Sequence, residues 1–149
     1  WRQGPLAQVK LLDQLSFGSF NNGFKPVRTP KDWICSDPAV VDAYIADPLA
    51  GHVISNQFWF DFLHGLADLS ETEDMAKIDA DLPIYLFAGD QDPVGKQGKG
   101  VVALQKALQR AGSKEVGCVL YPNGRPEMIN EHNREQVIAD LLAWLGQRS

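Results

Sequence analysis

Two apolar runs in the second half of the chain constrain its fold more than any other feature. Pro83 to Gly89 and Val116 to Tyr121 are almost uninterrupted stretches of apolar residues. Runs of this length suit strands of a parallel sheet that is covered on both faces. Two strands are too few for such a sheet, since an isolated pair is marginal in water and its open edge invites pairing with another chain. The predicted fold class is therefore α/β, with a parallel sheet that is incomplete in this chain.

Each predicted strand is followed by a predicted helix. The first helix has apolar residues at helical spacing and stops at Gly112. The second helix has Asn130 as its expected N-cap and ends at Gly146. The order strand, helix, strand, helix over residues 81–149 indicates a βαβα unit with a right-handed crossover.

Residues 1–80 show helical patterning and no convincing strand. Asp37-Pro38 starts a short helix, because proline suits the first helical position, and that helix ends near Asp47-Pro48. A second helix carries large apolar side chains at helical spacing, namely Phe58, Trp59, Phe62, Leu63 and Leu66. We expect these side chains to pack in a core; the alternative is that they line a lipid-sized pocket.

Charge and composition argue against several classes of partner. The net charge of −5 gives no electrostatic reason to expect nucleic acid or an anionic membrane. No apolar run approaches the roughly 20 residues of a membrane-spanning helix, and no signal peptide is visible. Cys35 and Cys118 lack the spacing of a metal site or a redox pair. We expect both to be free thiols, which suits a reducing compartment and predicts a cytoplasmic protein.

The loop after the first predicted strand contains two acidic residues, Asp90 and Asp92. Functional groups gather beyond the carboxyl ends of strands in open α/β sheets, and an acid there can orient a histidine. The alternative, which the loop alone favours, is that these carboxylates cap a turn or the next helix. The loop predicts no cofactor or metal, because it contains no P-loop and the twelfth position of a calcium loop would be Val101.

The residues after the second predicted strand resemble a known family of hydrolases. Three segments are similar, in order, to the last part of α/β-hydrolases of the serine aminopeptidase, monoacylglycerol-lipase and lysophospholipase group: Tyr121-Pro-Asn-Gly-Arg-Pro-Glu-Met-Ile-Asn-Glu131, Asn133-Arg134 and Trp144-Leu145. Residues 83–95 resemble the acid loop of that family, and stretches between Phe24 and Leu49 resemble its cap region. The resemblance covers nearly the whole chain.

This resemblance implies a fold, a site and a substrate class. The fold is a partial α/β-hydrolase fold, with a helical cap-like region at 1–80 and the C-terminal βαβα portion of the core at 81–149. Asp92 takes the position of the acid in the catalytic triad. The substrate of the parent protein is a lipid-like carboxylic ester, and neither a cofactor nor a metal ion is implied.

The chain departs from the family pattern at the other two triad positions. The histidine position is occupied by Pro126, and proline has no titratable group that could act as a general base. The Gly-x-Ser-x-Gly elbow of the nucleophilic serine is absent, and the nearest match, around Ser19, fails. His132 is expected to be a surface histidine, and the sequence suggests no acid partner for His52 or His64.

Two functional hypotheses follow from these residues. In the first, the chain is the C-terminal part of a serine hydrolase of the lysophospholipase and monoacylglycerol-lipase type and is inactive by itself. In the second, it is a non-catalytic fragment or pseudoenzyme that acts as a binding or interaction module through its exposed sheet edge. The expected partner is the missing N-terminal half of the family or a second copy of the chain.

Overall fold

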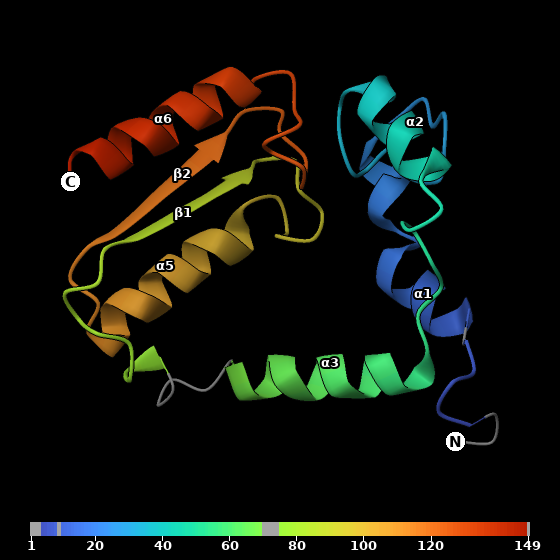
Figure 1. The fold of residues 1–149 in the computed structure, drawn as a ribbon, viewed down its shortest axis with the longest axis horizontal. Helices are drawn as coiled ribbons and strands as arrows, with labels where there is room; N and C mark the ends of the chain where they lie inside the picture. Colours follow the sequence, from blue (N-terminus) through green and yellow to red (C-terminus); the bar gives the residue numbers. More distant parts are fainter. Residues whose placement is uncertain (1–3, 9, 70–74, 149) are drawn as a thin grey trace.

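The computed structural model describes residues 4–8, 10–69 and 75–148 (Figure 1). Its C-terminal part contains a parallel two-stranded sheet of β1 (Ile84–Gly89) and β2 (Val116–Tyr121). The register runs from Ile84 opposite Val116 to Gly89 opposite Tyr121, so both strands end at the same edge of the sheet. The two apolar runs of the sequence are these strands, and the predicted parallel pairing is confirmed.

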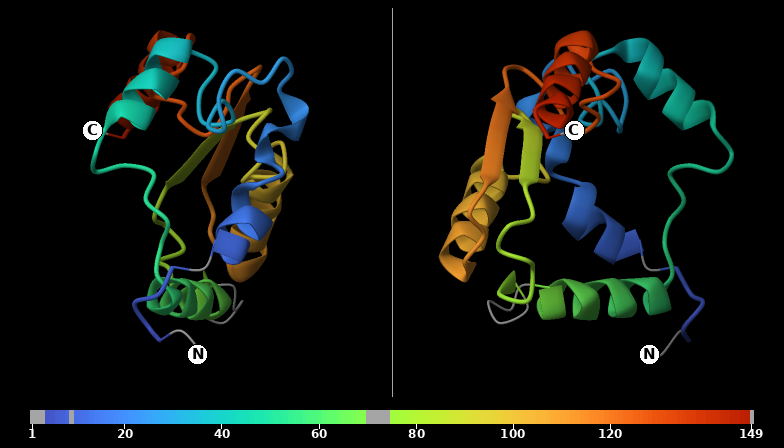
Figure 2. Two further views of the ribbon diagram at one scale, coloured as in Figure 1. Left: turned by 90° about the vertical axis from the view of Figure 1, so that its right-hand side faces the viewer. Right: turned by 60° about the vertical axis from the view of Figure 1, so that its left-hand side comes forward.

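Helices α5 (Lys99–Ala111) and α6 (Arg134–Gly146) lie on opposite faces of the sheet (Figures 1 and 2). Helix α5 ends as predicted at Gly112, whose φ of +116° lies in the left-handed region. The N–H of Gly112 bonds back to carbonyl oxygens of the last turn. The strand, helix, strand, helix order is confirmed.

The predicted N-cap of α6 is wrong. Asn133 occupies the N-cap position, with no side-chain cap, and α6 begins at Arg134. Asn130 lies in the preceding loop, where its Nδ2 donates to Glu127 Oε2 over 3.0 Å and its carbonyl oxygen lies 3.5 Å from Cys35 Sγ. Contacts with the distant Cys35 segment therefore place Asn130 ahead of the helix, and sequence spacing does not reveal such contacts.

The N-terminal part contains α1 (Lys10–Phe17), the 3₁₀ turn η1 (Phe20–Gly23), α2 (Pro38–Ala46) and α3 (Asn56–Leu69). Helix α2 has the predicted bounds. Asp37 caps it by accepting a 2.9 Å hydrogen bond from the N–H of Ala39, and Asp47 follows its last turn. Helix α1 and η1 were not predicted. Stacked rings of Phe17 and Trp33, with centroids 6.1 Å apart, join α1 to the segment before α2.

Each of these two parts contains one small cluster of buried apolar residues. One joins Ile34, Cys35 and Val41 of the N-terminal part. The other joins side chains of β2, the loop after it and α6, namely Tyr121, Met128 and Val137. Each cluster is small for a chain of this length, so much apolar surface is left outside them.

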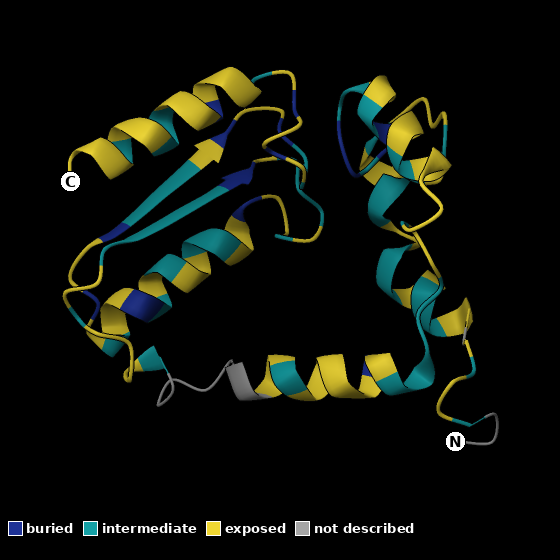
Figure 3. Ribbon diagram, viewed as in Figure 1, coloured by how far each residue is buried: buried dark blue, intermediate teal, exposed yellow. Residues whose placement is uncertain are grey.

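The expectation that α3 packs in a core is wrong for most of its apolar residues. Trp59 is buried, but Phe58, Phe62, Leu63 and Leu66 are each about half exposed. No described helix runs alongside α3, and Figure 3 shows most of its length as exposed (Figures 1 and 3). These side chains therefore form an open apolar surface in this chain.

The total surface of the chain is large for its mass. It exposes 9993 Å², whereas a compact monomer of 16.5 kDa exposes about 7,500 Å². The excess agrees with the two-stranded sheet and the open face of α3, and it supports the predicted incomplete sheet. None of the described helices is both long enough and apolar enough to cross a membrane. The division at residues 80 and 81 stays a prediction.

Candidate active site

The acid loop and the loop that carries position 126 meet at the carboxyl ends of the two strands. The N–H of Asp90 donates to the carbonyl of Tyr121, and the N–H of Gln91 to that of Gly124, each over 3.0 Å. Gly89 and Gly124 lie so close that a Cβ atom on Gly89 would be 2.0 Å from the oxygen of Gly124. Because glycine has no Cβ, the two loops can come into direct backbone contact.

Asp92 lies half-buried in the acid loop. Its Oδ1 accepts a 2.8 Å hydrogen bond from the N–H of Val94, and its carbonyl oxygen accepts one of 2.7 Å from Gln97. The carboxylate therefore caps its own turn, as the alternative interpretation of the loop had it. One oxygen, Oδ2, accepts no hydrogen bond from the residues that the structure describes, so capping leaves Asp92 able to accept another donor.

Asp90 is exposed and has a different role. Its Oδ1 accepts a 2.7 Å hydrogen bond from the N–H of Asn123, and Asn123 Oδ1 accepts one of 3.1 Å from Gln91 Nε2. Asn123 has a φ of +60°, a left-handed conformation that asparagine tolerates better than most residues. These bonds fasten the turn after β2 to the acid loop.

Position 126 is occupied by a half-buried proline whose carbonyl oxygen accepts a 3.0 Å hydrogen bond from the N–H of Met128. The three histidines lie elsewhere. His132 is exposed just before α6, as expected, and His52 and His64 are exposed in the N-terminal part. The His64 ring packs against Phe60 with centroids 4.3 Å apart.

A buried glutamate next to this loop was not predicted. Glu131 is 1% exposed, and its Oε1 accepts hydrogen bonds from the N–H groups of Ser36 at 2.9 Å and Arg125 at 3.1 Å. Its Oε2 accepts a hydrogen bond from the hydroxyl of Ser36. The carboxylate therefore joins its own loop to a segment 95 residues away in the sequence.

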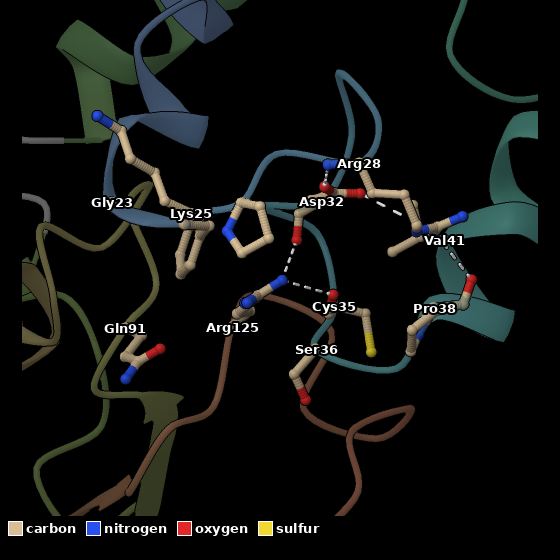
Figure 4. A pocket seen from close by; sticks show the side chains of 12 residues that line it. Gly23, Lys25, Arg28, Asp32, Cys35, Ser36, Pro38, Val41, Gln91 and Arg125 are labelled. Atoms are coloured by element: carbon tan, nitrogen blue, oxygen red, sulfur yellow. Dashed lines mark hydrogen bonds and ion pairs between the residues drawn. The ribbon is translucent and has the colours of Figure 1, made fainter.

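Arg125 completes the connection between these segments (Figure 4). Its Nη1 donates to the carbonyl oxygens of Asp32 and, over 2.9 Å, Cys35. Its guanidinium group lies 4.0 Å from the centroid of the Phe24 ring. The residues of the Gly-Arg-Pro-Glu and Asn-Glu stretches were recognised in the sequence, but nothing in their spacing indicates that they bind residues 32–36.

Two cavities flank the acid loop. One, of about 520 Å³, is lined by residues of the N-terminal part together with Gln91 and Arg125 (Figure 4). The other, of about 510 Å³, lies between the η1 region and residues 91–97 of the acid loop. Both are lined by Gly23, Phe24 and Gln91. The acid loop thus faces hollow space on the side of the N-terminal part.

The titratable groups beside the first cavity do not supply a nucleophile. Burial raises the pKa of the Cys35 thiol to about 11, so almost no thiolate forms near neutral pH. Burial opposes ionisation of Asp32 as well, but hydrogen bonds from Thr29 and Arg28 outweigh it and lower the pKa of this carboxyl. Neither cysteine forms a disulfide. Among the described residues, no cluster of three or more metal-ligating side chains is present.

Comparison with known proteins identifies relatives of about twice this length. The profile of the family described as serine aminopeptidase, S33, matches residues 5–133. A monoacylglycerol lipase of Mycolicibacterium smegmatis is 25% identical over 114 residues, which are 76% of this chain and 38% of that protein.

Solved structures agree with this family. A thermostable carboxyl esterase from Bacillus coagulans, in complex with glycerol, has a TM-score of 0.88 and 28% identity, covering 98% of this chain and 48% of that one. A lipase in an open form has a TM-score of 0.80 and 28% identity, covering 99% and 48%. The fold is also that of a Paleococcus ferrophilus monoacylglycerol lipase, with a TM-score of 0.58 and 17% identity over 97% and 56%. The chain, which spans about half the length of these proteins, belongs to the serine aminopeptidase S33 family of α/β-hydrolases.

Proposed function

We propose that this chain supplies the cap and the acid loop of a serine hydrolase for lipid-like carboxylic esters, with Asp92 as the acid that orients the catalytic histidine. The observation that carries the proposal is the direct backbone contact between the acid loop and the loop of position 126. In α/β sheets, ligands bind beyond the carboxyl ends of the strands, where both loops lie. Oδ2 of Asp92, to which no residue in the described part of the chain donates, is the acceptor that a histidine N–H requires.

The substrate class rests on the relatives and on the apolar surface. The relatives named above are a monoacylglycerol lipase, a carboxyl esterase and a lipase. The open side chains of α3 offer an apolar surface for an acyl chain. The cavities beside the acid loop are of the size that small-molecule ligands occupy.

We expect the chain alone to be inactive as an ester hydrolase. Nucleophilic catalysis by serine needs a base that accepts its proton, and Pro126 has no group that can do so. The chain also contains no Gly-x-Ser-x-Gly elbow. The Cys35 thiol is no substitute, because it stays protonated near neutral pH.

The test is hydrolysis of p-nitrophenyl butyrate by three samples: the chain alone, the chain with the N-terminal half of the family, and the same pair carrying Pro126→His. We expect turnover only in the third. In that sample Asp92→Asn should lower kcat by about 10⁴-fold, the effect expected when a triad acid is replaced by its amide. Asp90→Asn is the matched control, since Asp90 lies in the same loop but holds Asn123 instead.

Two results would count against the proposal. Turnover by the chain alone that is lost on Asp92→Ala would show that the chain needs no other half. Equal effects of Asp92→Asn and Asp90→Asn would remove Asp92 from the role of triad acid.

The second candidate is a binding module that pairs through its sheet edge. It is favoured by the large exposed surface and by the edge of β1, which pairs with no other strand among the described residues and offers its backbone groups to another chain. The partner is the N-terminal half of the family or a second copy of the chain. Analytical ultracentrifugation of the chain, alone and with the N-terminal half, distinguishes these two partners. A chain that pairs with itself has twice its monomer mass even when the N-terminal half is absent.

A further inference from the structure

We propose that Arg125 and Glu131 are positioning residues that fix position 126 to residues 32–36 of the N-terminal part. The inference rests on the proposed function, which makes position 126 the place of the catalytic base. Ser36, Arg125 and Glu131, which carry the polar contacts, are called the clasp below. None of the three is proposed to react with the substrate. The clasp acts only by holding residue 126 in place.

The backbone is held on both sides of position 126. On one side, the guanidinium group of Arg125 donates to the carbonyl oxygens of Asp32 and Cys35. On the other side, the N–H of Glu127 donates to the carbonyl oxygen of Ile34 over 3.2 Å. Because the flanking residues bind the same short segment, residue 126 cannot shift relative to that segment without breaking hydrogen bonds.

Glu131 makes this connection specific. Its buried carboxylate accepts three hydrogen bonds, two from Ser36 and one from the N–H of Arg125. A buried carboxylate is strongly destabilising unless such donors satisfy it, so the two segments are held in one arrangement. Removal of the Ser36 donors would leave most of this charge without partners.

None of these contacts uses the side chain of residue 126. The frame is therefore intact with proline, and a histidine introduced there meets the same backbone support. The clasp also forms part of a cavity wall, since Ser36 and Arg125 line the cavity of about 520 Å³. Figure 4 shows the guanidinium group of Arg125 pointing toward Asp32 and Cys35, and Ser36 among the residues that line the same cavity. A ligand in this cavity touches the residues that hold position 126.

The test reads the imidazole of the Pro126→His variant by NMR, in the full chain with the N-terminal half bound. A fixed ring gives one narrow set of signals. Ser36→Ala removes one hydroxyl donor to Glu131, and Arg125→Lys removes the guanidinium group whose Nη1 donates to two carbonyl oxygens. We expect both variants to broaden the ring signals about twofold or more, or to split them, as the ring samples several positions.

Tyr121→Phe is the matched control. It removes a buried hydrogen bond of 2.9 Å to Asp140 near the same loop without touching the clasp, so it reports the effect of lost stability alone. We expect this variant to leave the signals of the introduced imidazole unchanged at comparable loss of thermal stability. Ser36→Ala removes a single hydroxyl from a half-buried site, so it carries the test if Arg125→Lys does not fold.

Unchanged ring signals in Ser36→Ala would overturn the inference, as would equal broadening in Ser36→Ala and Tyr121→Phe. Ester turnover is not the readout. Failure of the hydrolase proposal appears as lack of turnover while the introduced imidazole is ordered, whereas failure of the clasp appears in the ring signals themselves.

Discussion

Pro126 lies in a loop that hydrogen bonds fasten to residues 32–36 on both sides of it. Arg125 and Glu131 form hydrogen bonds to residues 32–36, and in the adjoining loop no described residue donates to Oδ2 of Asp92. On the proposed function, a histidine placed at position 126 would meet this same backbone support. A single substitution is enough to test whether the loop can still present a base.

The Cys35 thiol gives a prediction about pH. Its pKa is raised to about 11 by burial, above the ordinary value of about 8.5 that it has when unfolded. The folded state thus holds this proton more tightly. Its contribution to stability is complete below about pH 8.5 and is lost as pH rises towards 11. Urea unfolding should show a falling free energy of unfolding over this range.

The control for this prediction is Cys35→Ala, which removes the thiol but not the other groups that titrate at high pH. Subtracting its pH profile from that of the unsubstituted chain isolates the contribution of Cys35. A difference that is flat from pH 8 to 11 would contradict the assigned pKa. Alkylation of Cys35 should also be slow at pH 7, because burial blocks it and the thiolate is scarce.

At the scale of elements, the contact between the ends of β1 and β2 sets the geometry of the site. Gly89→Ala would place a methyl group 2.0 Å from the carbonyl oxygen of Gly124. We expect this variant to lose about 3 kcal/mol or more of unfolding free energy, the upper range for overpacking. Gly23→Ala is the control, since its Cβ meets nothing within 4 Å and should change stability by less than about 1 kcal/mol. Equal losses in the two variants would contradict the close packing of the loops.

Local patterns predicted the elements that local interactions determine. The apolar runs gave both strands, and Asp37-Pro38 gave the start of α2, because capping and burial on both faces leave marks in adjacent residues. The acid role of Asp92 came from the family resemblance instead, since the loop by itself favours turn capping. Helix α1 was not predicted, since it is short and contains no buried residue among those described.

Contacts between distant residues could not be predicted from the pattern. The bonds from Glu131 to Ser36 join residues 95 positions apart, and Asn130 lies ahead of α6 because its loop binds the same region. The exposed face of α3 was expected to be core, since helical spacing shows that a face is apolar but not what covers it. The roles of Asp92 and of position 126 stay predictions, whereas the contacts of the clasp were not predicted.

At the scale of the whole molecule, the chain spans about half the length of the relatives it matches. The Bacillus coagulans esterase, which is about twice as long, aligns with 98% of this chain. The alignment therefore includes both the N-terminal and the C-terminal part. The surface exceeds that of a compact monomer by about a third. The open apolar face of α3 contributes to this excess, as does the edge of β1 that no strand of the described residues covers.

The most direct measurement compares p-nitrophenyl butyrate hydrolysis by the chain paired with the N-terminal half of the family, with Pro126 in place and after the Pro126→His substitution. Restoring a positioned general base should raise kcat by at least about 10²-fold. The account predicts this gain, with background turnover in the Pro126 sample. Equal rates in the two samples, whether both are active or both are inactive, would contradict it.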